Sequence, residues 1–158
     1  MTGTITTAFP LSFKAELPQK VHDFTQTTGD DFKLALIIAS PTGTYNKNTA
    51  NYSELVANSD EVPNGSGYTT GGFDFTPADN ITPAIDGNKA IWQWSVDPQF
   101  AAATFSTSGC IIYNASKGNR VVYVGSFGGV VTVTASTLNL NMPTLSDVTA
   151  LLRIGPSS

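Results

Sequence analysis

Charged residues are scarce in this 158-residue chain: they make up 13% of it, against roughly 25% in an average soluble domain. The 8 Lys and Arg residues form no basic cluster, and the net charge is −4. A nucleic-acid-binding surface requires clustered cations, so we expect no nucleic-acid partner. Threonine, serine, asparagine and glycine replace the missing charges, which is typical of β-rich proteins with many turns.

Cysteine and histidine occur once each, as Cys110 and His22. A single cysteine cannot form an intramolecular disulfide, and one Cys with one His cannot build a zinc site. No G-x-S-x-G motif supplies an activated serine for His22. The acidic residues show no calcium-loop spacing, although a calcium ion held by an irregular loop is left as an alternative. We therefore expect no enzyme and no cofactor.

Long apolar runs are also absent. None reaches the ~18 residues of a membrane span, and residues 1–13 (MTGTITTAFPLSF) lack the basic and apolar regions of a signal peptide. We expect no membrane contact, and synthesis in the cytoplasm without an export signal.

The apolar residues that are present alternate with a period of two along several stretches. Residues 32–38 (FKLALII) and 89–96 (KAIWQWSV) follow this pattern, which predicts two strands, the first of them central. Trp92 and Trp94 share one face of the second strand. We interpret them as core side chains because indoles bury large areas; a sugar-stacking platform is the alternative.

Residues 109–129 (GCIIYNASKGNRVVYVGSFGG) indicate a β-hairpin. Its two arms, residues 110–113 and 121–124, are β-branched and aromatic, and a polar turn separates them. The turn contains two of the chain's few cations, Lys117 and Arg120. We interpret both as solvated turn charges, with contact to an acidic partner surface as the alternative.

Further strand-like segments complete the pattern. The apolar positions change phase near residues 136–137, which predicts a bulge there because a strand's period is two. Short strands are also expected at residues 73–75, 81–85 and 150–154. About eight strands predict a mainly β chain, with residues 29–158 forming one antiparallel β-sandwich of jelly-roll-like or Greek-key connectivity.

Residues 1–28 are expected to form an N-terminal arm with a short helix. Phe13, Leu17 and Val21 are spaced as on one helix face, although Pro18 limits the helix to about two turns. We expect the arm to pack on its own domain. Contact with a neighbouring subunit or another partner through Phe9, Phe13 and Leu17 is the alternative.

Residues 40–72 are long, polar and rich in glycine and proline, with little periodicity. Loops of this length in a compact domain often carry function. We therefore predict a recognition surface in this segment, with Tyr45, Tyr52 and Tyr68 as its candidate residues.

Several segments, in a fixed order, resemble a family of small virion proteins of tailed bacteriophages. The segments that carry the resemblance are SFKAEL (residues 12–17), VHDF (21–24), TGDDFKLAL (28–36), SDEVPNGSGYTTGG (59–72), IYN and KGNRV (112–114 and 117–121) and LLRI (151–154). Two segments depart from the family pattern: residues 40–60 are longer, and YVGSFG (123–128) replaces V-L-D-F-G.

The resemblance implies a β-sandwich that assembles on the virion. Members of the family are described as virion structural, head-decoration or tail-associated proteins. We expect a capsid decoration protein, a homotrimer on the capsid exterior that binds the major capsid protein. The alternative is a tail or head-fibre component that contacts a glycan on the host surface.

Overall fold

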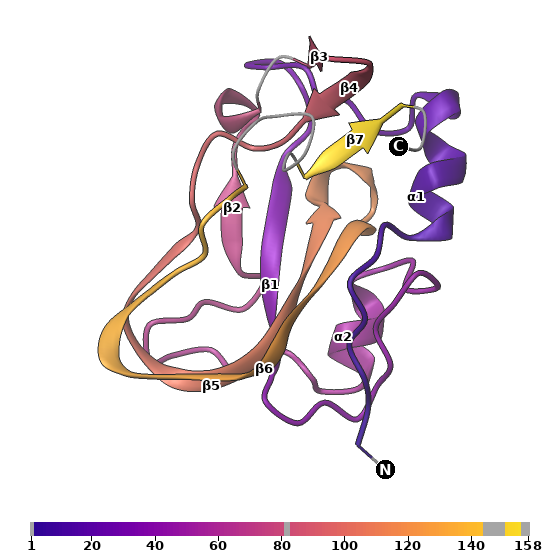
Figure 1. Ribbon diagram of the computed structural model, residues 1–158. Coiled ribbons are helices and arrows are strands. Elements are labelled where there is room, and N and C mark those ends of the chain that lie inside the picture. Colours follow the sequence, from indigo (N-terminus) through magenta and orange to yellow (C-terminus); the bar gives the residue numbers. More distant parts are fainter. Residues whose placement is uncertain (1, 81–82, 144–150, 156–158) are drawn as a thin grey trace.

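The computed structural model describes residues 2–80, 83–143 and 151–155. This part of the chain forms a four-stranded antiparallel sheet of order β2-β1-β5-β6 and a three-stranded antiparallel sheet of order β3-β4-β7 (Figure 1). The prediction of a mainly β fold with a short N-terminal helix is confirmed, and the arrangement is consistent with a β-sandwich. A jelly roll contains eight strands in two Greek keys, and that connectivity is not confirmed.

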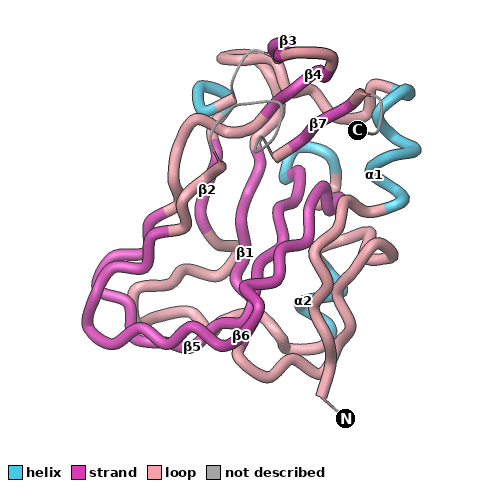
Figure 2. The backbone as a smooth tube through the Cα atoms, in the orientation of Figure 1, coloured by secondary structure: helices cyan, strands magenta, loops and turns pink. Residues whose placement is uncertain are grey.

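The elements follow the chain as Figure 2 shows. The helices are α1 (Leu11–Glu16) and α2 (Ser53–Ala57), and short 3-10 turns are η1 (Leu17–Gln19), η2 (Pro77–Asp79) and η3 (Ala115–Lys117). The strands are β1 (Phe32–Ile38), β2 (Phe73–Phe75), β3 (Ala84–Asp86), β4 (Lys89–Trp92), β5 (Gln99–Asn114), β6 (Arg120–Asn139) and β7 (Leu152–Ile154).

Strand β1 lies between β2 and β5, so the predicted central strand is confirmed. Its alternation places Leu34 and Leu36 in the main core, while Ala35 and Ile37 belong to a second cluster on the other face. Both faces are covered because β1 carries apolar residues at both sets of positions. The arm and the small sheet cover one face, and residues from the 40–72 segment cover the other.

The predicted hairpin is formed by β5 and β6. Tyr113 pairs with Val121 and Asn114 with Arg120, and the turn closes through η3 and Gly118, whose φ of 68° suits a residue without a side chain. The two strands are much longer than predicted, with 16 and 20 residues.

The predicted change of phase in β6 is also confirmed. The register with β5 shifts between the pairs Ala103–Ser136 and Phe105–Val133, so one extra residue lies in β6. Ala135 adopts a φ of 47° at this point. The bulge moves the inward-facing positions from Val131 and Val133 to Leu138.

The small sheet lies across one end of the large sheet (Figure 1). Trp92 and Trp94 are both buried there: Trp94 stacks on Phe75 with ring centroids 4.7 Å apart, and Trp92 lies 4.3 Å from Phe24. The core interpretation of the two tryptophans is therefore confirmed. The sugar-platform alternative is wrong, because a buried indole face cannot stack on a sugar. Strand β4 ends at Trp92 rather than continuing to residue 96.

The N-terminal arm packs on its own domain. Helix α1 begins at Leu11, ends at Glu16 and passes into η1, because Pro18 has no N–H to continue the α-helical hydrogen bonds. Lys20 then adopts a left-handed φ of 56°, so Val21 lies beyond the helical segment. Phe13 is buried in the main core, where its ring stacks on Phe9. The prediction that Phe13 contacts another subunit is therefore wrong.

Candidate functional site

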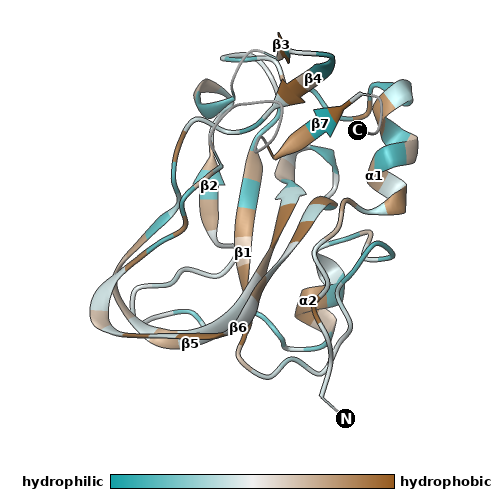
Figure 3. Cartoon of the chain, viewed as in Figure 1, coloured by the Kyte–Doolittle hydropathy of each residue, from teal (hydrophilic) through white to brown (hydrophobic). Residues whose placement is uncertain are grey.

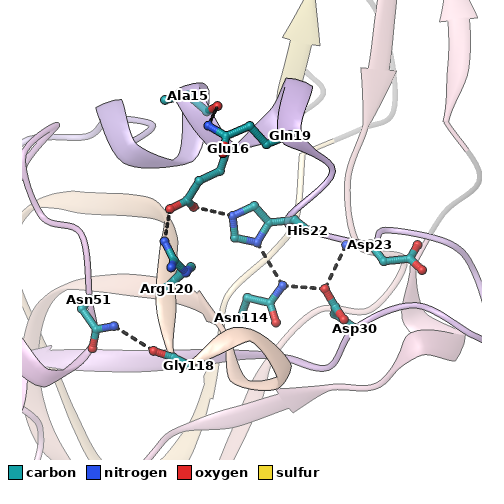
Figure 4. Close-up of polar contacts among 10 residues, drawn as sticks. All are labelled: Ala15, Glu16, Gln19, His22, Asp23, Asp30, Asn51, Asn114, Gly118 and Arg120. Atoms are coloured by element: carbon teal, nitrogen blue, oxygen red, sulfur yellow. Dashed lines mark hydrogen bonds and ion pairs between the residues drawn. The ribbon is translucent and has the colours of Figure 1, made fainter.

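Polar side chains from the arm and the hairpin turn meet in a buried cluster (Figure 4). His22 Nε2 lies 2.8 Å from Glu16 Oε2, and His22 Nδ1 lies 3.0 Å from Asn114 Nδ2. The same Asn114 nitrogen donates to Asp30 Oδ2 at 2.8 Å. Helix α1, the 22–30 loop and the end of β5 are joined by these three contacts.

The hydrogen-bond network assigns the tautomer of His22. The Asn114 amide nitrogen carries two protons, one donated to Asp30 and the other to His22 Nδ1. Nδ1 is then the unprotonated nitrogen, and Nε2–H donates to Glu16. Both ring nitrogens are occupied and the side chain is fully buried, so this histidine has no free lone pair for a substrate.

Lys117 and Arg120 pair with the two carboxylates of the same cluster. Arg120 forms an ion pair with Glu16, and Lys117 Nζ lies 3.3 Å from Asp30 Oδ1. These pairs hold the arm and the 22–30 loop on the hairpin turn. The side chains of Lys117 and Arg120 nevertheless remain 42% and 49% exposed, so contact with a capsid stays a prediction for both.

Asp60 anchors the first part of the 40–72 segment. Its fully buried carboxylate accepts hydrogen bonds from the amides of Thr42 (2.8 Å) and Gly43 (2.7 Å) and from the Tyr45 hydroxyl (2.8 Å). Burial disfavours the charged form of Asp60, but these bonds outweigh it and lower the pKa of the carboxyl. Burial and the bond to Asp60 raise the pKa of Tyr45.

Glu61 anchors the second part of the segment. It accepts hydrogen bonds from the hydroxyls of Tyr52 (2.5 Å) and Tyr68 (2.7 Å) and from the amide of Gly71 (2.7 Å). Burial and these bonds raise the pKa of both tyrosines. The Tyr52 ring also stacks on Tyr113, with centroids 4.5 Å apart.

The prediction of a tyrosine recognition surface is wrong for Tyr45 and Tyr68, because both are buried. Tyr52 is half-buried, and its hydroxyl is occupied by Glu61. Instead of forming an open loop, residues 40–72 fold onto the large sheet. The adjacent acids at 60 and 61, in a stretch rich in tyrosine, were the available signal for this network.

A cavity of about 310 Å³ opens beside β5 and β6, lined mostly by apolar side chains that include Cys110, Ile112 and Tyr123. Burial raises the pKa of Cys110 to about 12, so its thiol stays protonated at neutral pH. The cavity therefore offers no thiolate nucleophile.

The small sheet carries an exposed apolar row. Ile85 of β3 lies opposite Ala90 of β4, which lies opposite Ile154 of β7. Ile85 is 83% exposed and Ile154 56% exposed. An apolar groove lined by Leu17 and Leu152, among others, includes Ala90 and Ile154. We call Ile85, Ala90 and Ile154 the small-sheet row; Figure 3 shows the hydrophobic colouring of β3 and β4.

Three residues of the arm, Phe9, Phe13 and Leu17, were also considered as contact residues. The half-buried Leu17 lies beside the small-sheet row. Phe9 is half-buried, with its ring 5.3 Å from that of Tyr123. Phe13 belongs to the core, as described above. The structure thus brings only Leu17 to an exposed apolar surface.

Within the described ranges, no group of three or more His, Cys, Asp or Glu side chains is placed to hold a metal ion. No helix in that part of the chain is long and apolar enough to cross a membrane. The chain matches no protein-family model, no curated protein and no solved structure.

Proposed function

We propose that the protein is a structural component of a bacteriophage virion, a decoration protein that binds the major capsid protein on the outside of the head. It acts by contact, without catalysis and without a cofactor. The sequence resemblance over residues 12–154 supports the virion assignment. The small-sheet row is the observation that carries binding to a protein partner.

The small-sheet row is larger than the single exposed apolar side chains common on protein surfaces. Its three residues lie side by side across three strands and continue into a groove. Contiguous exposed apolar patches mark interaction sites. Covering one fully exposed isoleucine stabilises a complex by about 1.5–3 kcal/mol, so Ile85 and Ile154 are the expected centres of the contact.

The two polar clusters support a role that requires a rigid platform. Glu16, Asp30 and Glu61 each hold a separate segment of the chain, and none of these carboxylates faces an open site. An arm fixed by His22 and Arg120 keeps Leu17 beside the small-sheet row. Partner-binding residues therefore sit on a surface that is ordered before binding, which lowers the entropic cost of association.

The glycan-binding alternative rested on five aromatic residues, and four of them, Trp92, Trp94, Tyr45 and Tyr68, are buried. The fifth, Tyr52, is half-buried and its hydroxyl donates to Glu61. A glycan site would require other aromatic side chains on the surface, and we propose the decoration role in its place.

The test is the number of copies on purified particles, measured by quantitative mass spectrometry of separated heads and tails. We expect hundreds of copies per head for the wild-type chain. The double variant Ile85→Asp with Ile154→Asp should reduce head occupancy at least ten-fold, because it places charges in the apolar contact. Val56→Asp is the matched control: Val56 is an exposed apolar residue on α2, away from the small sheet in Figure 1.

Two outcomes would contradict the proposal. A handful of wild-type copies confined to tails would exclude a decoration role. Full head occupancy by the double variant would exclude the small-sheet row as the contact.

A further inference from the structure

Strand β6 is an edge strand of the large sheet, and only its first half is covered on the outer side. Ala8 exchanges two backbone hydrogen bonds of 2.9 Å with Val124, and the Val121 amide donates to Ala50 at 2.9 Å. For residues 128–139, the part of the chain that the structure describes supplies backbone pairing only from β5. This half of the hairpin bends where it leaves β1, and its far end returns on the side of β2, where Phe100 of β5 lies 6.5 Å from Phe73 (Figure 1).

The open half of β6 lacks the charged residues and prolines that protect many edge strands. Natural edges carry charged residues or proline, which prevent pairing with other strands. Residues 121–142 contain no charged residue and no proline, and neither do residues 99–116 of the hairpin's other strand. The segment 130–134 (VVTVT) is entirely β-branched, and Val130 is 57% exposed. These properties favour addition of another strand.

Bulges limit the regular part of this edge. Ala102 in β5 and Ala135 in β6 adopt φ values of 50° and 47° beside the shifts of register. At the other end the register shifts again between Thr107 and Gly109. Three pairs between that shift and the bulges are regular, with Ser106 opposite Thr132 and their hydroxyls 2.8 Å apart. Residues 131–133, with Val130 and Thr134 on either side, are therefore the length of regular edge available for a new strand.

We infer that segment 130–134 pairs with the same segment of a second copy of this chain, antiparallel, about a two-fold axis at Thr132. Two copies of a chain with net charge −4 repel each other. This edge is a surface where they can meet without placing like charges opposite each other. The pairing is isologous and closes at two subunits.

The segment is complementary to itself in this register. Val131 lies opposite Val133 of the second copy, so the half-buried valine face continues across the pair. Thr132 lies opposite Thr132, and Val130 opposite Thr134, on the exposed face. Cross-strand pairs of β-branched residues and of threonines stabilise sheets.

This inference is independent of the virion assignment, and it replaces the homotrimer implied by the resemblance with a two-fold pair. Disulfide trapping tests it directly in the full chain. Thr132→Cys places two thiols directly opposite each other, at a separation that a disulfide can bridge. Thr134→Cys, on the same exposed face, places its two thiols four residues apart, or roughly 13 Å along the strands.

We expect mild oxidation to give at least ten-fold more covalent dimer for Thr132→Cys than for Thr134→Cys, as read on a non-reducing gel. The only native cysteine, Cys110, is buried and contributes no background. Equal cross-linking by the two variants, or none by Thr132→Cys, overturns the inference.

A second variant tests the interface without oxidation. Thr132→Lys brings two ammonium groups together at the axis, whereas Asn48→Lys adds the same charge at an exposed turn residue. Light scattering should give twice the chain mass of 16.6 kDa for the wild type and for Asn48→Lys, and a single chain mass for Thr132→Lys. A monomeric wild type, or an oligomer that Thr132→Lys leaves intact, overturns the inference.

Discussion

The buried carboxylate of Asp60 provides a sharp test of what holds the 40–72 segment on the sheet. Oδ1 accepts from the Thr42 amide, and Oδ2 accepts from the Gly43 amide and the Tyr45 hydroxyl. In Asp60→Asn the new NH₂ group must replace one of these oxygens. In either orientation of the new side-chain amide, its NH₂ group faces the backbone N–H of Thr42 or of Gly43, and that N–H loses its acceptor.

The magnitude follows from that mismatch. An unsatisfied buried donor costs about 1–3 kcal/mol, and the remaining bonds weaken because they are no longer charge-assisted. We expect Asp60→Asn to lower the free energy of unfolding by about 2–4 kcal/mol. The exposed Asp74, whose ion pair with Lys33 spans 2.8 Å, is the matched control; Asp74→Asn should cost at most about 1 kcal/mol.

The pH dependence supplies an independent check. Because the folded-state pKa of Asp60 is lowered, its ionised form stabilises the fold above the ordinary aspartate pKa of about 3.9. That contribution is lost as the pH falls through the folded-state value. Asp60→Asn lacks a titrating group at this position, so its free energy of unfolding should fall less between about pH 5 and pH 2.

Urea denaturation followed by tryptophan fluorescence measures both effects, since Trp92 and Trp94 are buried. The reasoning is refuted if Asp60→Asn costs no more than Asp74→Asn. It is also refuted if the variant and the wild type lose stability equally in acid.

Two further predictions concern the polar cluster and the thiol. Asn114→Ala removes the donor shared by His22 and Asp30. We expect the free energy of unfolding, measured in urea, to fall by about 2–3 kcal/mol, and the N-terminal arm to be digested faster by a protease. Unchanged digestion would show that this contact does not hold the arm in place. Because Cys110 is buried and burial raises its pKa to about 12, a disulfide reagent at pH 8 should label the folded chain at least about 100-fold more slowly than the urea-unfolded chain. Equal labelling rates would contradict that placement.

Local sequence patterns predicted those elements whose structure depends mainly on residues that are neighbours in the sequence. The alternation in residues 32–38 specifies a strand with two apolar faces, and such a strand must lie inside a sheet. The polar turn at residues 114–120 specifies the hairpin, and the change of phase in β6 requires an extra residue near Ser136. Each of these features needs only neighbours in sequence.

The predicted recognition surface in residues 40–72 was wrong for Tyr45 and Tyr68 because long-range contacts determine how this segment folds. Tyr45 and Tyr68 lie in polar, irregular sequence, where no periodicity marks a buried residue. They are buried because Asp60 and Glu61 accept their hydroxyl hydrogens, which makes burial of a polar group tolerable. The identity of each donor and acceptor depends on the folded arrangement of the whole segment.

The cations of the hairpin turn show the same limit. Because cations are rare in this sequence, Lys117 and Arg120 could be selected as candidate contact residues. Their partners, Asp30 and Glu16, could not be predicted, because they lie about 90–100 residues away. Only the packing of the arm on the hairpin brings those charges together.

Cryo-electron microscopy of purified virions that contain this chain tests the proposed function most directly. The decoration role predicts density for this fold at many positions on the outside of the capsid, with the small-sheet row in contact with the major capsid protein. A capsid exterior that lacks this fold, with the chain absent from the particle or confined to the tail, would contradict it.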